Sequence, residues 1–192
     1  GASKGEGLGN QFLANIRETD AILHVLRCFD DPNVVHVDGS VDPIRDKEII
    51  DAELQLKDLE TVDSRIQKVQ KQAQTGGDKQ AKQIYEVLVK YKAALEQGLS
   101  ARTVTFDNKD DEKIARELFL LTAKPVLYVC NVDEASAATG NEYVERVREV
   151  AKQEGAEVLV IAAKIESEIA EFETYEERQM FLAEIGLEES GV

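Results

Sequence analysis

The sequence is poor in several features that mark particular classes of protein. It has two cysteines, Cys28 and Cys130, so no disulfide framework is expected and a reduced, cytosolic compartment is the simplest inference. It has no apolar run near the ~18 residues of a membrane-spanning helix, and no charged-then-apolar leader typical of a signal peptide. It also lacks the pattern Gly, four residues, Gly-Lys-Ser/Thr that marks a phosphate-binding loop. The rest of the composition, with 43% hydrophobic residues, is typical of a soluble globular chain.

Charge is distributed unevenly along the chain. The formal net charge of -15 argues at first against nucleic acid as a partner. Residues 43–122, however, hold 14 basic and 15 acidic residues, whereas the remainder holds 9 basic and 23 acidic residues. Within the middle segment, residues 65–92 contain seven basic and two acidic residues. An acidic body therefore carries one basic patch.

Three short apolar runs predict the strands of a sheet. Residues 126–130 form an unbroken, β-branched run behind Pro125, which is typical of a strand buried on both faces of a parallel sheet. Residues 21–27 and 157–162 are the other two predicted buried strands. Because an amphipathic helix over 141–154, stopped by Gly155, precedes the last strand, the pattern predicts a parallel α/β arrangement. Further predicted elements are helices over 8–17 and 174–185 and a short strand at 34–37.

Two long amphipathic segments predict a helical hairpin. Apolar residues advance in steps of three and four over 44–74 and again over 79–97. Gly76 and Gly77 separate the two segments, and Asp78 is available as the N-cap of the second. The narrow apolar stripes favour an antiparallel coiled-coil hairpin over two ordinary helices on a globular core. A connection over 98–105 and a return helix over 109–121 are predicted to follow.

Polar residues follow the strand at 126–130. Ligands of open α/β sheets bind beyond the carboxyl ends of such strands. The Asn131 amide can donate to or accept from a base nitrogen. The Glu134 carboxylate can only accept hydrogen bonds, which suits the exocyclic amine of a purine. A hydrogen bond to a charged group contributes roughly 1.5–3 kcal/mol. Small side chains in Ala162-Ala163-Lys164 would let backbone N–H groups approach a planar ring. The alternative is a capped strand end that leads into a loop.

These features together resemble the Obg-like ATPase (YchF) family of P-loop nucleotidases. The opening segment, residues 1–13, is similar to the segment that follows the family's Asp-x-x-Gly switch motif. Asn131-Val132-Asp133-Glu134 matches its Asn-x-x-Glu, which stands where relatives have Asn-Lys-x-Asp. Ala162-Ala163-Lys164 is similar to the base loop that reads Ser-Ala-Lys in relatives. The helical hairpin matches the family's coiled-coil insertion, so the resemblance covers the entire chain.

The resemblance implies a partial nucleotidase domain. Residues 1–42 would hold the end of the switch region and the first strand, 43–122 the coiled-coil insertion, and 123–192 the base-recognition half. The phosphate-binding loop, the magnesium ligands and the switch aspartate would lie upstream, and a C-terminal TGS domain downstream. This chain alone is therefore expected not to be catalytic, and no catalytic or metal-binding residue is assigned in it. The residues expected to move with the switch are Gly1, Lys4, Gly5, Gly7 and Asn10.

The resemblance also implies activity and partners for the parent protein. It would hydrolyse ATP, with GTP as a second candidate substrate, and use Mg²⁺ as cofactor. It would act in the cytoplasm as a monomer that does not bind membranes. Glu134 in place of aspartate and Val132 in place of lysine would relax guanine preference and make adenine tolerable or favoured. The basic patch would contact ribosomal RNA, unless its lysines merely solvate a coiled coil. A non-catalytic module that presents the arm to RNA or to a protein is the alternative. The candidate RNA contacts are Arg65, Lys68, Lys71, Lys79 and Lys82.

Overall fold

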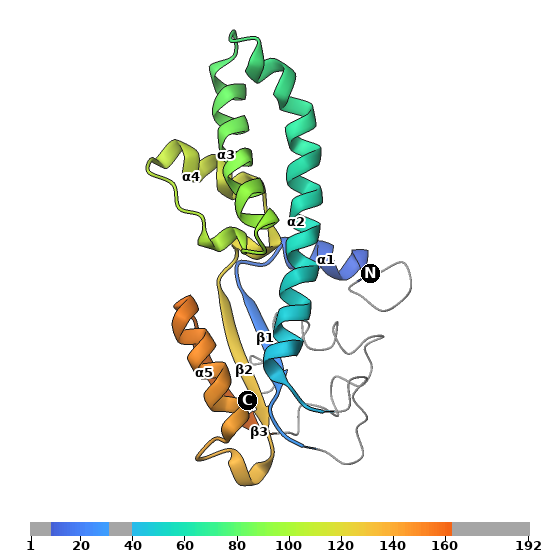
Figure 1. Cartoon of the computed structure of the whole chain (residues 1–192), viewed down its shortest axis with the longest axis vertical. Helices are drawn as coiled ribbons and strands as arrows, with labels where there is room; N and C mark the ends of the chain where they lie inside the picture. Colours follow the sequence, from blue (N-terminus) through green and yellow to red (C-terminus); the bar gives the residue numbers. More distant parts are fainter. Residues whose placement is uncertain (1–8, 31–39, 163–192) are drawn as a thin grey trace. The chain divides into compact units, whose positions relative to one another are not determined.

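The computed structural model describes residues 9–30 and 40–162 of the chain (Figure 1). The chain divides into two compact units, a sheet unit of residues 1–50 and 125–192 and a helical unit of residues 51–124. The insertion predicted at 43–122 overlaps most of the helical unit. The strand predicted at 34–37 and the helix predicted at 174–185 lie outside the described residues. The elements are α1 Asn10–Arg17, β1 Ile22–Arg27, α2 Pro43–Gln74, α3 Lys79–Glu96, η2 Ala101–Thr103, α4 Lys109–Glu117, η3 Leu121–Ala123, β2 Val126–Val132, η4 Glu134–Ser136, α5 Glu142–Glu154 and β3 Glu157–Ala162.

The sheet unit contains a parallel three-stranded sheet in the order β1-β2-β3, which confirms the predicted α/β class. Val129 at the centre of β2 pairs with Val25 of β1 and with Leu159 of β3. One face of the sheet is covered by α5, which runs alongside the strands in Figure 1. The core between them is built from buried side chains of both layers: Leu26, Cys28, Tyr128, Cys130, Val132, Val144, Val147 and Ala151.

Two strands differ from their predicted form. β2 was expected to end at Cys130, but it continues through Val132 because Asn131 still pairs with Arg27 of β1 and Ile161 of β3. β3 has the predicted bounds but is not fully buried, and 39% of Leu159 is exposed. Among the described strands β3 lies at an edge of the sheet, so it has a hydrogen-bonded neighbour on one side only.

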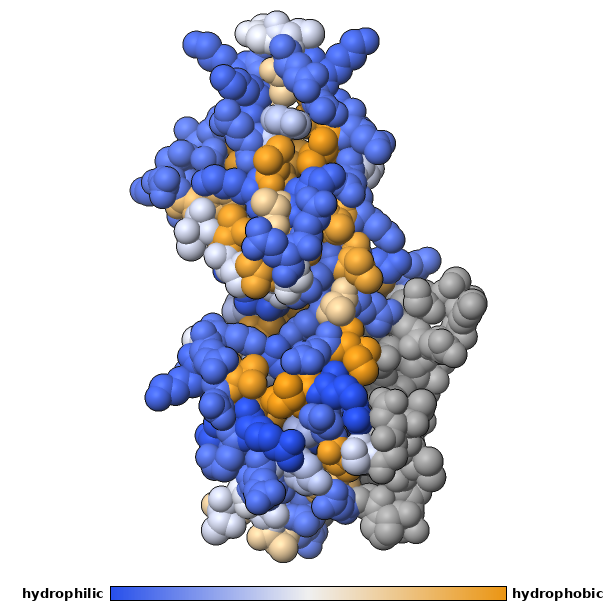
Figure 2. All heavy atoms as spheres, viewed as in Figure 1, coloured by the Kyte–Doolittle hydropathy of each residue, from blue (hydrophilic) through white to orange (hydrophobic). Residues whose placement is uncertain are grey.

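The helical unit is a hairpin with a third helix packed against it. α2 and α3 run antiparallel, Gly76 at the tip has a φ of 77°, and the Asp78 side chain caps α3 by accepting from the Ala81 N–H at 3.0 Å (Figure 1). Figure 2 shows hydrophobic side chains in the seam between the helices and hydrophilic ones over the tip. The return helix was predicted to reach Leu121, but α4 ends at Glu117. The core shared by these elements is Val62, Val87, Leu88, Tyr91, Leu95, Ala101, Ala115, Leu118 and Leu120.

Although α2 has 32 residues, neither it nor any other helix in the described part of the chain is apolar and long enough to cross a membrane.

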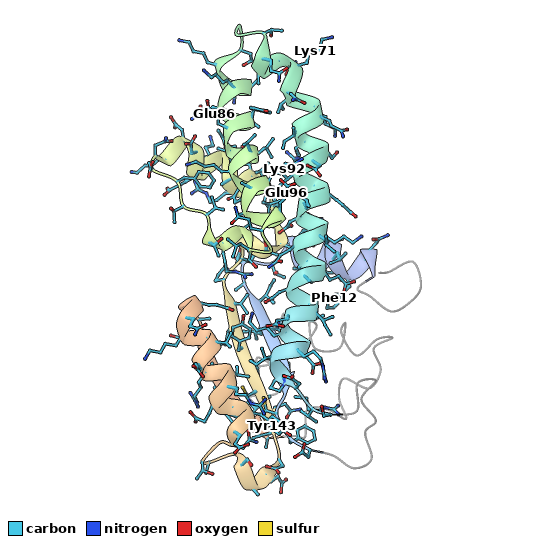
Figure 3. The ribbon with its side chains drawn as sticks, in the orientation of Figure 1. Phe12, Lys71, Glu86, Lys92, Glu96 and Tyr143 are labelled. Atoms are coloured by element: carbon cyan, nitrogen blue, oxygen red, sulfur yellow. The ribbon has the colours of Figure 1, made fainter. Side chains whose placement is uncertain are left out.

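Polar side chains join α2 and α3 at their surface. Lys92 of α3 extends toward α2, and its Nζ lies 2.7 Å from Oδ1 of Asp63 (Figure 3).

A buried carboxylate joins α2 to the end of the helical unit. Asp58 is fully buried and accepts hydrogen bonds from the backbone N–H of Leu121 at 2.8 Å and of Thr122 at 2.7 Å. The Thr122 hydroxyl also donates to Asp58 at 2.7 Å and accepts from the Ala101 N–H at 2.8 Å. Because these donors are buried, the carboxylate satisfies groups that would otherwise lose their hydrogen bonds to water.

We expect Asp58→Asn to lower the free energy of unfolding by about 2–4 kcal/mol, because an amide nitrogen would face N–H donors and one buried acceptor would be lost. Urea denaturation followed by far-ultraviolet circular dichroism measures the change. Asp63→Asn on the same helix is the matched control. It should cost less than about 1 kcal/mol, since the Lys92–Asp63 pair is partly exposed. Equal losses for the two variants would contradict the role given to Asp58.

Candidate functional site

Asn131 is held rigidly near the carboxyl end of β2. Its main chain pairs with both neighbouring strands, and its carbonyl accepts a 2.8 Å hydrogen bond from the Cys28 N–H. The side chain is also buried, with 1% of the residue exposed. Its Oδ1 accepts no hydrogen bond from any residue in the described part of the chain. A buried acceptor left in this way costs about 1–3 kcal/mol, and the usual explanation is a partner that comes from elsewhere.

Two acidic residues after β2 have different surroundings. Asp133 caps η4, and its Oδ1 accepts from the Ser136 N–H at 3.0 Å. Glu134 is the first residue of η4 and is exposed. The carboxylate of Asp133 thus stabilises the turn, whereas that of Glu134 is presented to solvent, where it can accept a hydrogen bond from a ligand.

The remaining predicted base-site residues flank these two. Val132 is fully buried and packs in the core with Val144 and Val147 of α5. Its main chain pairs with Ala162, the half-buried last residue of β3. Ala163 and Lys164 lie outside the described residues.

Of the predicted switch residues, the structure describes Asn10 alone. It is exposed and is the first residue of α1, while Gly1, Lys4, Gly5 and Gly7 lie outside the described residues. Within the described ranges, no three or more His, Cys, Asp or Glu side chains are grouped so that they could hold a metal ion.

Asn141, at the far end of the loop after β2, makes two hydrogen bonds, and the sequence indicates only one of them. Its Oδ1 caps α5 by accepting from the Val144 N–H at 3.0 Å, and its Nδ2 donates to the Cys28 carbonyl at 2.7 Å. The Gly140-Asn141 pair before an amphipathic pattern signals the cap. No local signal identifies Cys28, which lies 113 residues earlier.

The two cysteines are buried, free thiols on neighbouring segments of the sheet. A hydrogen bond to the Cys130 thiol, together with burial, raises the pKa of Cys28 far above its ordinary value. Because the thiolate is the reactive form, Cys28 is unsuited to act as a nucleophile at neutral pH.

A second polar cluster fixes the first turns of α2 to the sheet. Lys47 is buried, and its Nζ lies 2.8 Å from Oε2 of Glu154 at the end of α5. The Tyr128 hydroxyl of β2 donates to the other oxygen of Glu154 at 2.5 Å. The Lys47 Nζ also lies 5.6 Å from the centre of the Tyr128 ring. Each carboxylate oxygen of Glu154 has a donor, so we assign this cluster a structural role in joining α2, β2 and α5. The sequence analysis did not predict it.

The candidate RNA contacts are all exposed on the two helices that meet at the hairpin tip. Arg65, Lys68 and Lys71 lie on α2, and Lys79 and Lys82 lie on α3. Among the described residues, none of the five makes an ion pair with an acidic side chain. Their charge is therefore available to an external anion.

No family model matches the chain. It is nevertheless 54% identical over 194 residues to the ribosome-binding ATPase YchF of Bacillus subtilis (strain 168), an alignment that covers 100% of this chain and 52% of that protein. It is 42% identical over 161 residues to Obg-like ATPase 1 of Oryza sativa subsp. indica, covering 83% and 41% respectively. The chain is homologous over its whole length to the YchF/Obg-like ATPases.

A solved structure supports the same conclusion. The structure of the Schizosaccharomyces pombe YchF GTPase matches with a TM-score of 0.73 at 34% identity, covering 95% of this chain and 50% of that one. The resemblance to the family that the motifs indicate is thereby confirmed. The chain spans about half the length of the curated YchF relatives it matches.

We expect Asn131→Val to leave the free energy of unfolding unchanged or to raise it by up to about 1 kcal/mol, because valine suits a strand and removes the unsatisfied acceptor. Urea denaturation of the chain measures this. Thr122→Val is the matched control, since it removes a buried polar group that is fully hydrogen-bonded, and it should cost about 1–3 kcal/mol. A similar loss for Asn131→Val would show that its side chain is satisfied within the protein.

Proposed function

We propose that the protein containing this chain is a nucleoside triphosphatase whose base site is formed by Asn131 and Glu134. The buried, unsatisfied Oδ1 of Asn131 carries the proposal, because it is a fixed polar group near the carboxyl end of the central strand, where open α/β sheets bind their ligands. The names of the relatives, which describe ATPases and in one solved structure a GTPase, support the same chemistry.

The residues around Asn131 favour adenine. The Glu134 carboxylate only accepts hydrogen bonds, and the exocyclic amine of adenine is a donor. Val132 occupies the position of the lysine found in Asn-Lys-x-Asp motifs, and its side chain is buried in the core, so it leaves the face of the base uncovered. Ala162, Ala163 and Lys164 would form the small-residue loop on the other side of the ring.

Hydrolysis would be phosphoryl transfer to water, which depends on positioning and charge stabilisation rather than on covalent chemistry by the protein. Mg²⁺ would neutralise charge on the phosphates, and no residue in the described part of the chain is assigned to it. Asn10 and the four preceding switch positions would respond to the phosphates without a catalytic role. The contribution of this chain is to hold and identify the base.

We expect Glu134→Asp to shift preference from ATP toward GTP by roughly three- to tenfold, because the shorter carboxylate restores the reach that suits two guanine donors. Calorimetric titration of ATP and GTP into a protein of the relatives' full length measures both affinities. Glu142→Asp is the control, since Glu142 is exposed in the first turn of α5. Tight GTP binding that ignores the residue at position 134 would show that the base site has been wrongly assigned.

We also propose that the hairpin tip contacts ribosomal RNA. We further propose that the protein is cytoplasmic and binds the ribosome as a monomer. Five exposed basic side chains surround a tip whose one acidic residue, Asp78, caps α3. The curated YchF relatives are named ribosome-binding ATPases. The alternative is an arm that binds a protein partner, and its affinity would not fall steeply with salt. Contacts with phosphates predict an affinity that does fall steeply with salt.

Reversing four tip lysines to glutamate should lower the fraction of a full-length protein that sediments with ribosomes by at least about tenfold at low salt. The four are Lys68, Lys71, Lys79 and Lys82. The control for net charge reverses four exposed basic residues away from the tip, Lys109 and Lys113 on α4 and Arg148 and Lys152 on α5, and it should have a small effect. Unchanged sedimentation of the tip variant would rule out the arm as the RNA contact.

A further inference from the structure

The loop between β2 and α5 is closed at both ends by one residue. Cys28, directly after β1, donates its N–H to the Asn131 carbonyl at 2.8 Å. Its own carbonyl accepts from Asn141 Nδ2 at 2.7 Å. The start and the end of the segment that carries Glu134 are therefore fixed to the same residue, which directly follows a neighbouring strand.

The interior of this loop is held by its own short-range hydrogen bonds. The Ser136 N–H donates to Oδ1 of Asp133 at 3.0 Å, and the Gly140 N–H donates to the Ser136 carbonyl at 2.7 Å. Gly140 has a φ of 75°, which glycine adopts without strain, and it turns the chain into Asn141. These bonds give the loop its shape, whereas its attachment to the sheet depends on Asn131 and Asn141.

The two hydrogen bonds of Asn141 can be separated chemically. The oxygen caps α5, and serine at the same position would retain that acceptor, because serine and asparagine are comparable N-caps. Serine has no second polar atom with which to reach the Cys28 carbonyl. Asn141→Ser thus removes the tie to the sheet and keeps the cap.

We propose that Asn141 is a positioning residue for base specificity, and that it acts by holding Glu134 in place relative to Asn131. The inference rests on the proposed function, because it concerns how the same base site distinguishes adenine from guanine. Discrimination between the two bases depends on where a single carboxylate lies. When the tie to Cys28 is lost, the loop can shift while Asn131 stays in the sheet, so the carboxylate reaches donors of either base.

The first test compares Asn141→Ser with Asn108→Ser in a protein of the relatives' full length. Asn108 is the matched control because it caps α4 in the helical unit, accepting from the Asp111 N–H at 2.8 Å. Calorimetric titration of ATP and GTP should show that the ratio of the two dissociation constants falls roughly three- to tenfold for Asn141→Ser, a range set by the net worth of one hydrogen bond. The ratio should not change for Asn108→Ser. An unchanged ratio in Asn141→Ser would overturn the inference.

A double-mutant cycle with Glu134→Ala tests the route of the effect, because residues that act through one another are not additive. Asn141→Ser should have no further influence on the ATP/GTP ratio once Glu134 is replaced by alanine. An effect of the same size in both backgrounds would assign Asn141 a general structural role and reject the inference. If Glu134→Ala itself leaves the ratio unchanged, the proposed base site fails. If Glu134→Ala changes the ratio and Asn141→Ser does not, the positioning role alone fails.

Discussion

The main-chain pairing of β2 with strands on both sides determines the chemistry available in the sheet unit. Because this pairing continues through Asn131, a polar side chain is fixed near the carboxyl end of the central strand instead of moving with a surface loop. Its orientation is then set by backbone hydrogen bonds, at no further entropic cost to a ligand. The same constraint leaves Oδ1 of Asn131 buried, where no group among the described residues donates a hydrogen bond to it. Stability and binding capacity are therefore opposed at this position, as is common at functional sites.

In the helical unit, a buried acidic side chain is bound within the protein, whereas the basic side chains near the tip are exposed. Asp58 is enclosed among N–H and hydroxyl donors of the same unit and joins α2 to η3. The basic side chains near the tip are exposed and make no ion pairs among the described residues. A small apolar seam suffices to hold the helices together, because α4 and η3 add a third layer of apolar contacts.

Local patterns predicted most element bounds, because the signals that end helices are local. Asp78 and Gly155 mark the start of α3 and the end of α5 by capping alone. The end of β2 was misplaced because Asn131 is polar and follows an apolar run, whereas its strand conformation is imposed by partners distant in sequence. For the same reason, the sequence gives no signal that Asp58 is buried, since its donors lie more than 60 residues away. Of the candidate site, the sequence identified Asn131 and Glu134 but not the residue that ties their loop to the sheet.

The cluster of Lys47, Tyr128 and Glu154 limits which single substitutions the sheet unit tolerates. Replacing the lysine alone would remove a cation from a partly buried carboxylate, and replacing the glutamate alone would remove an acceptor from a buried ammonium group and from a phenol. The three positions lie on three different elements, yet an acceptable substitution at one requires compensation at the others. The three side chains therefore act as one unit that joins the first turns of α2 to β2 and α5.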